Sequence, residues 1–208
     1  MHSSDTLLYL VRHGETDWNR ERRLQGTLDV PLNDTGIAQA RQLASHFTAL
    51  PIAGVASSPL VRSSATAVLL ANVRVCPLRI DARLREVDHG SLSGVTMADI
   101  AQRFPSLVEN DQLTSEAFDV SGGECLLDVS RRVSDVLADL LSWHEGQSVV
   151  VVGHGVTLAV MWCAAHAVDP ARFGAHVPPN AAGVVLRFSQ RQLIESRPVV
   201  SAPVEMPQ

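Results

Sequence analysis

Two short apolar segments that each end in a histidine and a glycine constrain the fold of this chain most. The segment at 7–11 is followed by an Arg-His-Gly tripeptide that contains His13, and the four valines at 149–152 by a Gly-His-Gly tripeptide that contains His154. A short, continuous apolar run is typical of a strand buried on both faces of a parallel sheet. Open α/β sheets bind ligands beyond the carboxyl ends of their strands. The two segments therefore predict two imidazoles side by side at a ligand site.

The rest of the sequence alternates between strand-like and helix-like segments. This alternation predicts an α/β fold of three layers, α/β/α, with a mostly parallel central sheet covered by helices on both faces. We expect one domain over residues 1–208, with a long loop at 12–33, a lid at about 88–122 and a frayed tail at about 198–208. The expected strands are 7–11, 54–57, 76–80, 148–152 and 182–188, and the expected helices are 33–47, 60–71, 123–144 and 156–167.

The composition disfavours several classes of function. The 208 residues carry a net charge of −5, which argues against binding to nucleic acid or to an acidic membrane surface. No apolar run approaches the roughly 20 residues of a membrane-spanning helix. All 17 basic residues are arginine, so the chain has no lysine for Schiff-base chemistry.

The cysteines and the N-terminus predict a cytoplasmic protein. Cys76, Cys125 and Cys163 are an odd number at wide spacing, which fits neither a disulfide framework nor a zinc motif. The N-terminus has no basic region before its short apolar stretch, so it does not resemble a signal peptide. We expect these thiols to be reduced and without a chemical role.

The sequence RHGETDWN at 12–19 resembles the signature of the histidine phosphatase superfamily, which includes cofactor-dependent phosphoglycerate mutases and many phosphatases. The resemblance implies that His13 is the nucleophile and becomes phosphorylated. His154 matches the second histidine of the family, which also stands in a Gly-His-Gly or Ser-His-Gly setting. The resemblance extends over roughly residues 6–188 and implies a phosphoglycerate mutase-like fold.

Two further segments resemble elements of the same family. The sequence SSPLVRSSATA at 57–67 resembles the element whose arginine binds phosphate, which assigns that role to Arg62. The sequence LREVDHG at 84–90 resembles the element that carries the proton donor, which assigns that role to Glu86. Spacing alone does not choose between Glu86 and Asp88, because side chains two residues apart on an extended segment point the same way. The register of the family motif favours Glu86.

These motifs together predict phosphoryl transfer without a metal ion or another cofactor. Arg12, Arg62 and the amide of Asn19 would hold a phosphate dianion, and their positive charge would stabilise the transition state. His154 would add a proton donor. The resemblance also implies that Gln25, Gly26 and Gly155 bind phosphate or substrate.

The proposed chemistry sets the protonation states of two residues. His13 must be neutral, because it attacks phosphorus through the lone pair of a ring nitrogen. Glu86 must be protonated to donate to the leaving alkoxide, so we expect burial to raise its pKa. A zinc site built from His13, His89 and His154 is the alternative, but the neighbouring arginines would repel a dication.

Three activities remain open, with a phosphomonoesterase favoured over a phosphoglycerate mutase and a non-catalytic phosphate or phosphopeptide binder. Mutases of the family typically have Glu-Arg-His-Tyr-Gly around the acid, whereas this chain has Val87 and His89 at the arginine and tyrosine positions. A binder would be expected to lose His13, Glu86 or His154, and all three are present.

The expected partner is a small-molecule phosphate monoester, and a homodimer is an open option. Three arginines after the nucleophile could contact a second anionic group or simply face solvent; they are Arg20, Arg22 and Arg23. The sequence GGEC at 122–125 resembles the start of a helix in the family, and we give it no role in the chemistry.

Overall fold

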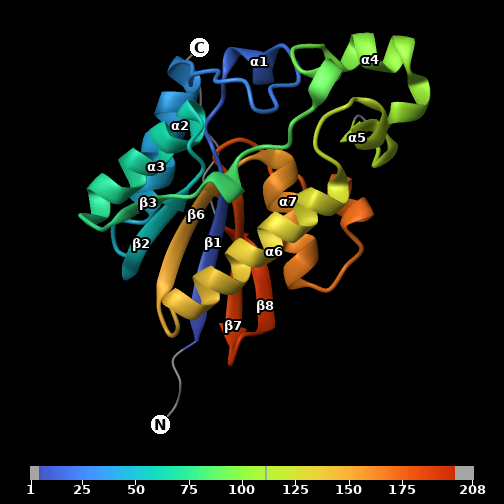
Figure 1. Ribbon diagram of the computed structural model, residues 1–208. Helices are drawn as coiled ribbons and strands as arrows, with labels where there is room; N and C mark the ends of the chain where they lie inside the picture. Colours follow the sequence, from blue (N-terminus) through green and yellow to red (C-terminus); the bar gives the residue numbers. More distant parts are fainter. Residues whose placement is uncertain (1–4, 111, 200–208) are drawn as a thin grey trace.

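The computed structural model describes residues 5–110 and 112–199, which form a six-stranded sheet between two layers of helices (Figure 1). The strand order is β3-β2-β6-β1-β7-β8. The first four strands are parallel, β7 is antiparallel to β1, and β8 is antiparallel to β7. The architecture is therefore the predicted α/β/α sandwich. The strands of this sheet are β1 (Thr6–Arg12), β2 (Ile52–Ser57), β3 (Leu78–Ile80), β6 (Ser148–Gly153), β7 (Gly183–Ser189) and β8 (Gln192–Val199).

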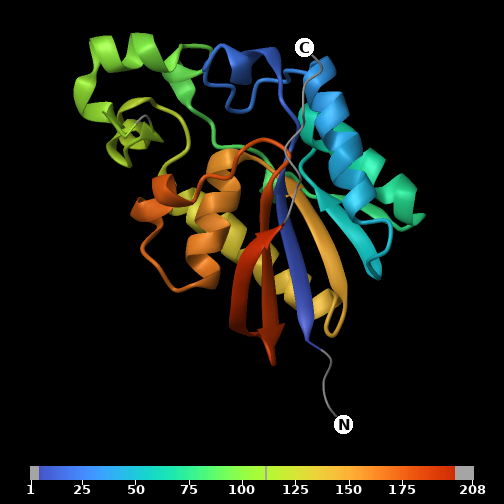
Figure 2. The same ribbon diagram turned by 180° about the vertical axis from the view of Figure 1, so that it is seen from behind.

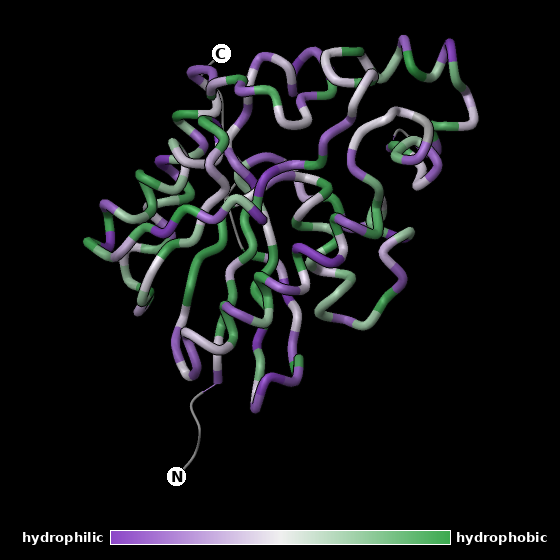
Figure 3. The backbone as a smooth tube through the Cα atoms, viewed as in Figure 1, coloured by the Kyte–Doolittle hydropathy of each residue, from purple (hydrophilic) through white to green (hydrophobic). Residues whose placement is uncertain are grey.

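Helices cover both faces of the sheet (Figure 2). Successive side chains of a strand such as β1 point to opposite faces. Leu8 and Leu10 belong to the buried cluster that includes α6 and α7, whereas Tyr9 and Val11 belong to the cluster that includes α2 and α3. Because β1 is apolar on both faces, it is among the hydrophobic central strands in Figure 3. The longer helices are α2 (Asp34–His46), α3 (Val61–Arg74), α6 (Leu126–Trp143) and α7 (Gly155–Ala165).

The parallel pairing of β1 with β6 brings the two predicted histidines together. The register places Arg12 opposite Gly153, so His13 and His154 follow at neighbouring strand tips. Gly183 allows the close approach of β7, since a Cβ at this position would lie 1.8 Å from the carbonyl oxygen of Leu10. The carboxyl edge of the sheet is therefore a fixed platform for both imidazoles.

The first two residues of the expected frayed tail, 198 and 199, belong to a strand. Residues up to Val199 belong to β8, while 200–208 lie outside the described residues. Pro198 is tolerated in this strand because β8 is at the edge of the sheet. The β7–β8 turn is formed by Gln190 and Arg191, both with positive φ (49° and 64°). Such turns favour Asn-Gly, so this sequence gives little indication of a hairpin.

The lid lies beyond the carboxyl edge of the sheet and has its own small core (Figure 1). Its buried side chains include Ile100, Leu107 and Leu113, which form a cluster separate from the two sheet clusters. The elements of this region are η2 (Gly90–Leu92), α4 (Met97–Arg103), η3 (Pro105–Leu107), β4 (Val108–Glu109), β5 (Gln112–Leu113) and α5 (Glu116–Val120).

Three short elements complete the described structure, and they are α1 (Asp17–Arg20), η1 (Ala82–Leu84) and η4 (Pro170–His176). The helix α1 lies within the segment expected to be a loop. Thr16 and Asn19 cap it reciprocally, side chain to backbone, which explains how four residues form a helical turn. No helix in the described part of the chain is long and apolar enough to cross a membrane.

Candidate active site

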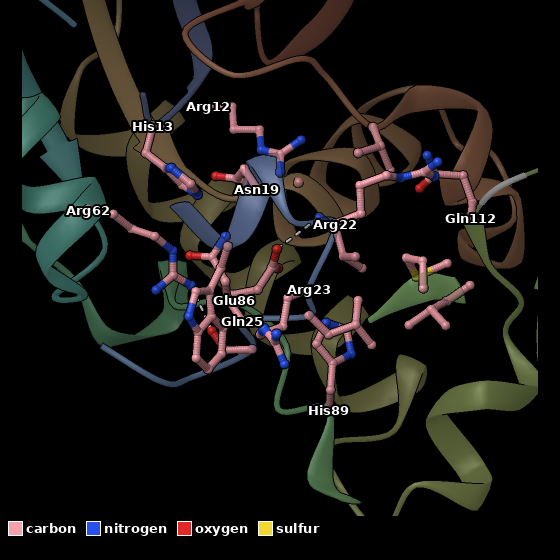
Figure 4. Close-up of a pocket in the computed structure, with 18 of the residues that line it drawn as sticks. Arg12, His13, Asn19, Arg22, Arg23, Gln25, Arg62, Glu86, His89 and Gln112 are labelled. Atoms are coloured by element: carbon pink, nitrogen blue, oxygen red, sulfur yellow. Dashed lines mark hydrogen bonds between the residues drawn. The ribbon is translucent and has the colours of Figure 1, made fainter. Parts of the chain in front are cut away.

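A cavity of about 210 Å³ opens at the carboxyl edge of the sheet, below the lid (Figure 4). Its walls come from the tip of β1 and the loop that follows it, the start of α3, the segment before η2, the lid and the start of α7. His154 is fully buried and lies beside His13, with ring centroids 5.2 Å apart. The other predicted site residues all line the cavity, and they are Arg12, His13, Asn19, Gln25, Gly26, Arg62, Glu86 and Gly155.

His13 is held in one tautomer by its own loop. Its Nδ1 lies 2.6 Å from the carbonyl oxygen of Gly14. A carbonyl can only accept, so Nδ1 carries the proton and Nε2 keeps its lone pair. Burial, followed by the charges of Arg12 and Arg62, holds the pKa of His13 well below its usual range. The ring is therefore neutral at neutral pH, as the proposed nucleophile must be.

His154 is also neutral, and one of its ring nitrogens can donate a hydrogen bond to a ligand. Burial, followed by the charge of Arg62, holds its pKa well below the usual range. Its Nε2 lies 2.8 Å from the hydroxyl of Ser58, which also accepts the amide N–H of Leu60 at 3.2 Å. Nδ1 is buried and has no hydrogen-bond partner among the described residues. When Ser58 donates to Nε2, Nδ1 carries the proton and can donate to an anion.

Two arginines form the cationic part of the cavity, Arg62 buried and Arg12 half-buried. Nη1 of Arg12 donates to the carbonyl of Pro178 at 2.9 Å, and Nη1 and Nη2 of Arg62 donate to the carbonyls of Leu28 and Gly26, each at 2.7 Å. Burial lowers the pKa of Arg62 to about 10, so it stays charged at neutral pH. The Nε groups of both arginines are buried without a partner among the described residues. An unpaired buried N–H costs about 1–3 kcal/mol, which a bound anion would recover.

Asn19 is oriented by a residue that the sequence analysis missed. Its Oδ1 accepts hydrogen bonds from the backbone and hydroxyl of Thr16, both at 3.1 Å, and from Nδ2 of Asn180 at 3.2 Å. This leaves the Nδ2 end of Asn19 to donate into the cavity. Nδ2 of Asn180 also lies 3.1 Å from the carbonyl of His13. Asn180 precedes β7 and is 161 positions from Asn19, so no local motif marks it.

Glu86 is buried against the first turn of α7. Its Oε1 accepts the amide N–H of Thr157 at 3.1 Å and the hydroxyl of the same residue at 3.0 Å, and its Oε2 accepts the amide of Val156 at 3.3 Å. The N-terminus of a helix favours a negative charge. The rival acid Asp88 is engaged elsewhere, because its Oδ1 accepts the amide of Gly90 at 2.8 Å.

The expected rise in the pKa of Glu86 is wrong for the unliganded site. Burial does raise this pKa, but the charge of His89, the backbone amide of Val87 and the charge of Arg62 lower it by more. The net shift is downward, so the carboxyl group is ionised at neutral pH. Burial of this carboxyl group could be anticipated from the sequence, whereas the hydrogen-bond donors and charges that surround it are set by the fold.

Two of the three loop arginines line the cavity, and His89 lines it as well. Arg22 and Arg23 line the cavity, whereas Arg20 does not line it and pairs with Asp17 at 3.0 Å on the surface. His89 is buried and lines the cavity, although the sequence analysis considered it only as a metal ligand. No acidic residue from the described part of the lid lines the cavity.

The site is arranged for an anion. Among residues 5–110 and 112–199, no three His, Cys, Asp or Glu side chains are grouped to hold a metal ion. His13, His89 and His154 therefore do not form the alternative zinc triad. The donors that converge are guanidinium, imidazole and amide groups, which bind phosphate oxygens.

Comparison with known proteins identifies the family of this chain and agrees with the fold. The chain belongs to the histidine phosphatase superfamily (branch 1), whose sequence profile matches residues 8–197, and it is an enzyme of this phosphatase class. It is 33% identical over 185 residues to phosphoserine phosphatase 1 of Hydrogenobacter thermophilus, covering 89% of this chain and 88% of that protein. It is 37% identical over 161 residues to the probable phosphoglycerate mutase GpmB of Salmonella choleraesuis, covering 74% and 72%.

The solved structures include a similar phosphatase. The mycobacterial glucosyl-3-phosphoglycerate phosphatase superimposes with a TM-score of 0.79 and 28% sequence identity, covering 96% of this chain and all (100%) of that one. The likeness therefore extends over the sheet, both helical layers and the lid. The relatives carry different substrate names, so membership of the family leaves the substrate of this chain to be proposed.

Proposed function

We propose that this protein hydrolyses a small phosphate monoester through a phosphohistidine intermediate on His13, without a metal ion or another cofactor. The state of His13 carries the proposal. Its Nδ1 donates to a carbonyl at 2.6 Å, which leaves the lone pair on Nε2, and the ring is neutral at neutral pH. Beside it, two buried arginine Nε groups and Nδ1 of His154 have no partner among the described residues.

In the first step, Nε2 of His13 forms a bond to phosphorus as the bond from phosphorus to the leaving oxygen breaks. The electron pair of the broken bond goes to the leaving oxygen, which takes the proton from Glu86. Arg12 and Arg62 hold the non-bridging oxygens, and positive charge placed there stabilises the transition state. General acid catalysis of this kind typically contributes ~10²–10⁴-fold in rate.

Substrate binding would favour the protonated form of Glu86, which takes this proton from solvent. A phosphate dianion next to this carboxyl group raises its pKa, because like charges disfavour the ionised form. Burial acts in the same direction, whereas Arg62 is then shared with the phosphate. The acid is therefore formed in the complex with the substrate.

In the second step, a water molecule attacks the phosphorus of phospho-His13. The carboxylate of Glu86, left unprotonated by the first step, takes a proton from this water. The bond from phosphorus to nitrogen breaks, its electron pair returns to Nε2, and inorganic phosphate leaves. Two displacements of this type restore the starting enzyme.

Phosphoserine is the first substrate to test. The relative that is 33% identical over most of both chains is named a phosphoserine phosphatase. The same cavity contains Arg22, Arg23 and His89, whose positive or protonatable groups suit a second anionic group on a phosphate ester. Glucosyl-3-phosphoglycerate, the substrate named for the mycobacterial structure, is the second.

A mutase is the second candidate function, because the relative that is 37% identical is named a probable phosphoglycerate mutase. One experiment separates the two activities. Hydrolysis of p-nitrophenyl phosphate in excess EDTA is measured beside a 3-phosphoglycerate mutase assay primed with 2,3-bisphosphoglycerate. We expect phosphate release at the same rate with and without EDTA, and no isomerisation. Loss of activity in EDTA that zinc restores would contradict the metal-free mechanism, and isomerisation would favour the mutase.

A further inference from the structure

We propose that Arg132 and Glu124, which lie outside the cavity, are positioning residues that fix the general acid Glu86 through its backbone. The inference rests on the function proposed above and identifies how the acid is held. Arg132 lies on α6, and Glu124 lies just before it. Glu124 belongs to the segment 122–125, for which the sequence predicted no role in the chemistry.

Arg132 connects the start of α6 to the backbone on one side of Glu86. Its Nε and Nη2 donate to the two carboxylate oxygens of Glu124, at 2.6 and 2.9 Å. Its Nη1 donates to the carbonyl oxygens of Arg83 and Arg85, at 2.5 and 2.9 Å. Arg85 is the residue directly before Glu86. The bidentate pair with Glu124 fixes the orientation of the guanidinium group. Its remaining donor, Nη1, can then hold the carbonyls of Arg83 and Arg85 in place.

Glu124 also connects the same unit to the backbone on the other side of the acid. Its amide N–H donates to the carbonyl of Asp88 at 3.0 Å. The approach is close, since a Cβ at Gly123 would lie 2.1 Å from that same carbonyl oxygen. The segment from Arg85 to Asp88 is thus held at both ends by residues 123–132, with Glu86 between the two attachments.

The side chain of Glu86 is then completed by α7. The hydroxyl of Thr157 lies 2.8 Å from the carbonyl oxygen of Arg85 and 3.0 Å from Oε1 of Glu86, so its one proton is shared between these two acceptors. Arg132 and Thr157 therefore share the carbonyl of Arg85 as an acceptor. A displacement of this peptide would move the carboxyl group relative to the scissile bond, while Arg12 and Arg62 are attached to other segments.

A buried ion pair is a costly way to stabilise a fold. Arg132 is only 9% exposed, and burying two charges costs solvation free energy that an apolar pair of similar shape would avoid. The guanidinium group of this pair directs two further hydrogen bonds to the carbonyls of Arg83 and Arg85, just before one functional side chain. Positioning of the acid accounts for this arrangement, because a loop held only by apolar contacts would lack such directional bonds.

The positioning role predicts a dependence on the leaving group. Phenyl phosphate and p-nitrophenyl phosphate have nearly the same shape, but phenoxide is the more basic leaving group and gains more from a proton donor. The ratio kcat/KM reports the steps through release of the alcohol. Misplacement of Glu86 therefore lowers kcat/KM for phenyl phosphate and leaves that for p-nitrophenyl phosphate nearly unchanged.

The experiment compares both substrates in Arg132→Met, Glu124→Gln and Arg132→Lys, with Glu86→Gln as the reference for a missing acid. We expect Arg132→Met and Glu124→Gln to lose roughly 10-fold or more of kcat/KM for phenyl phosphate, and less than about 3-fold for p-nitrophenyl phosphate. Arg132→Lys should recover part of the loss. The matched control is Asp139→Asn, which removes an ion pair of 2.8 Å between α6 and Arg83 and leaves the carbonyl contacts in place. It should show no such dependence.

Equal losses for both substrates in the folded Arg132 and Glu124 variants would overturn the positioning role and leave a structural one. So would the same leaving-group dependence in Asp139→Asn. If the wild-type protein hydrolyses both esters but Glu86→Gln shows no dependence, the acid is another residue and the inference fails while the phosphatase function stands. Thermal denaturation identifies a variant that does not fold, and the remaining variants then decide.

Discussion

His13 and His154 are kept neutral at the centre of the molecule, where an imidazolium ion would lie beside two guanidinium groups. Both rings are buried, and burial together with the neighbouring arginine charges holds both pKa values well below the usual range. In the unfolded chain a histidine titrates near pH 6.5. Between that pH and the lower pKa of the folded state, the unfolded chain binds more protons than the folded one.

This difference predicts that the free energy of unfolding falls as the pH falls below about 6.5. Each buried histidine contributes a slope of up to about 1.4 kcal/mol per pH unit. Urea denaturation of the wild type and of His13→Asn, measured from pH 8 to pH 5, tests the sign. The difference between the two free energies of unfolding, wild type minus variant, should be constant above about pH 7.5 and should decrease as the pH falls. A difference that stays constant down to pH 5 would mean that His13 is not held neutral in the folded protein.

At the scale of elements, the hairpin of β7 and β8 shows what the sequence could not reveal. Gln190 and Arg191 occupy the left-handed region, which costs an ordinary L-residue about 1–2 kcal/mol relative to a right-handed one. Both residues are exposed, and they lie near the amino ends of the parallel strands, at the end of the sheet opposite the cavity. The turn is therefore a place where stability can be gained without affecting the site.

Replacement of both turn residues by Gln190→Asn and Arg191→Gly should raise the free energy of unfolding by about 1 kcal/mol, because Asn-Gly suits a turn with two positive φ angles. Hydrolysis of p-nitrophenyl phosphate should be unchanged. The control Arg191→Ala keeps a Cβ in the left-handed region and should give no gain. Urea denaturation provides the measurement, and a double variant no more stable than the wild type would contradict this account of the turn.

Elements that depend on a local sequence pattern were predictable from the sequence, whereas those that depend on capping, turn geometry or distant contacts were not. The central strands and the longer helices were predictable because their apolar residues repeat at the period of the element. The helix α1 and the strand β8 were missed, since one depends on a reciprocal cap and the other is exposed and follows an unfavourable turn. Boundaries differ by a few residues, as at β2, which begins at Ile52 and not at Gly54.

The candidate site divides in the same way. Residues inside dense motifs, such as His13 and Arg62, were identified from the sequence and line one cavity. Asn180 and Arg132 were not, because each acts through a hydrogen bond to a segment far away in the chain. The pKa of Glu86 was misjudged for a similar reason, since the amides of α7 and the charge of His89 reach it only in the folded structure.

At the scale of the whole molecule, the sheet turns several distant motifs into one site. The parallel strands β1, β2 and β6 end at one edge, so the segments that follow them bring His13, Arg62 and His154 to the same place. The segment 88–122, which we expected to be a lid, lies beyond this edge (Figure 1). Our proposed mechanism requires that a covalent bond between phosphorus and His13 forms at this edge.

Trapping of the phosphoenzyme tests that claim most directly. The protein is mixed with p-nitrophenyl phosphate, quenched in alkali within the first turnovers, digested and examined by mass spectrometry, with His13→Ala as the control. We predict one added phosphoryl group on the peptide that contains His13, absent from the control and lost on mild acid treatment, as expected of a phosphohistidine. Rapid hydrolysis with no phosphoryl group on His13, or the same label on the His13→Ala protein, would contradict it.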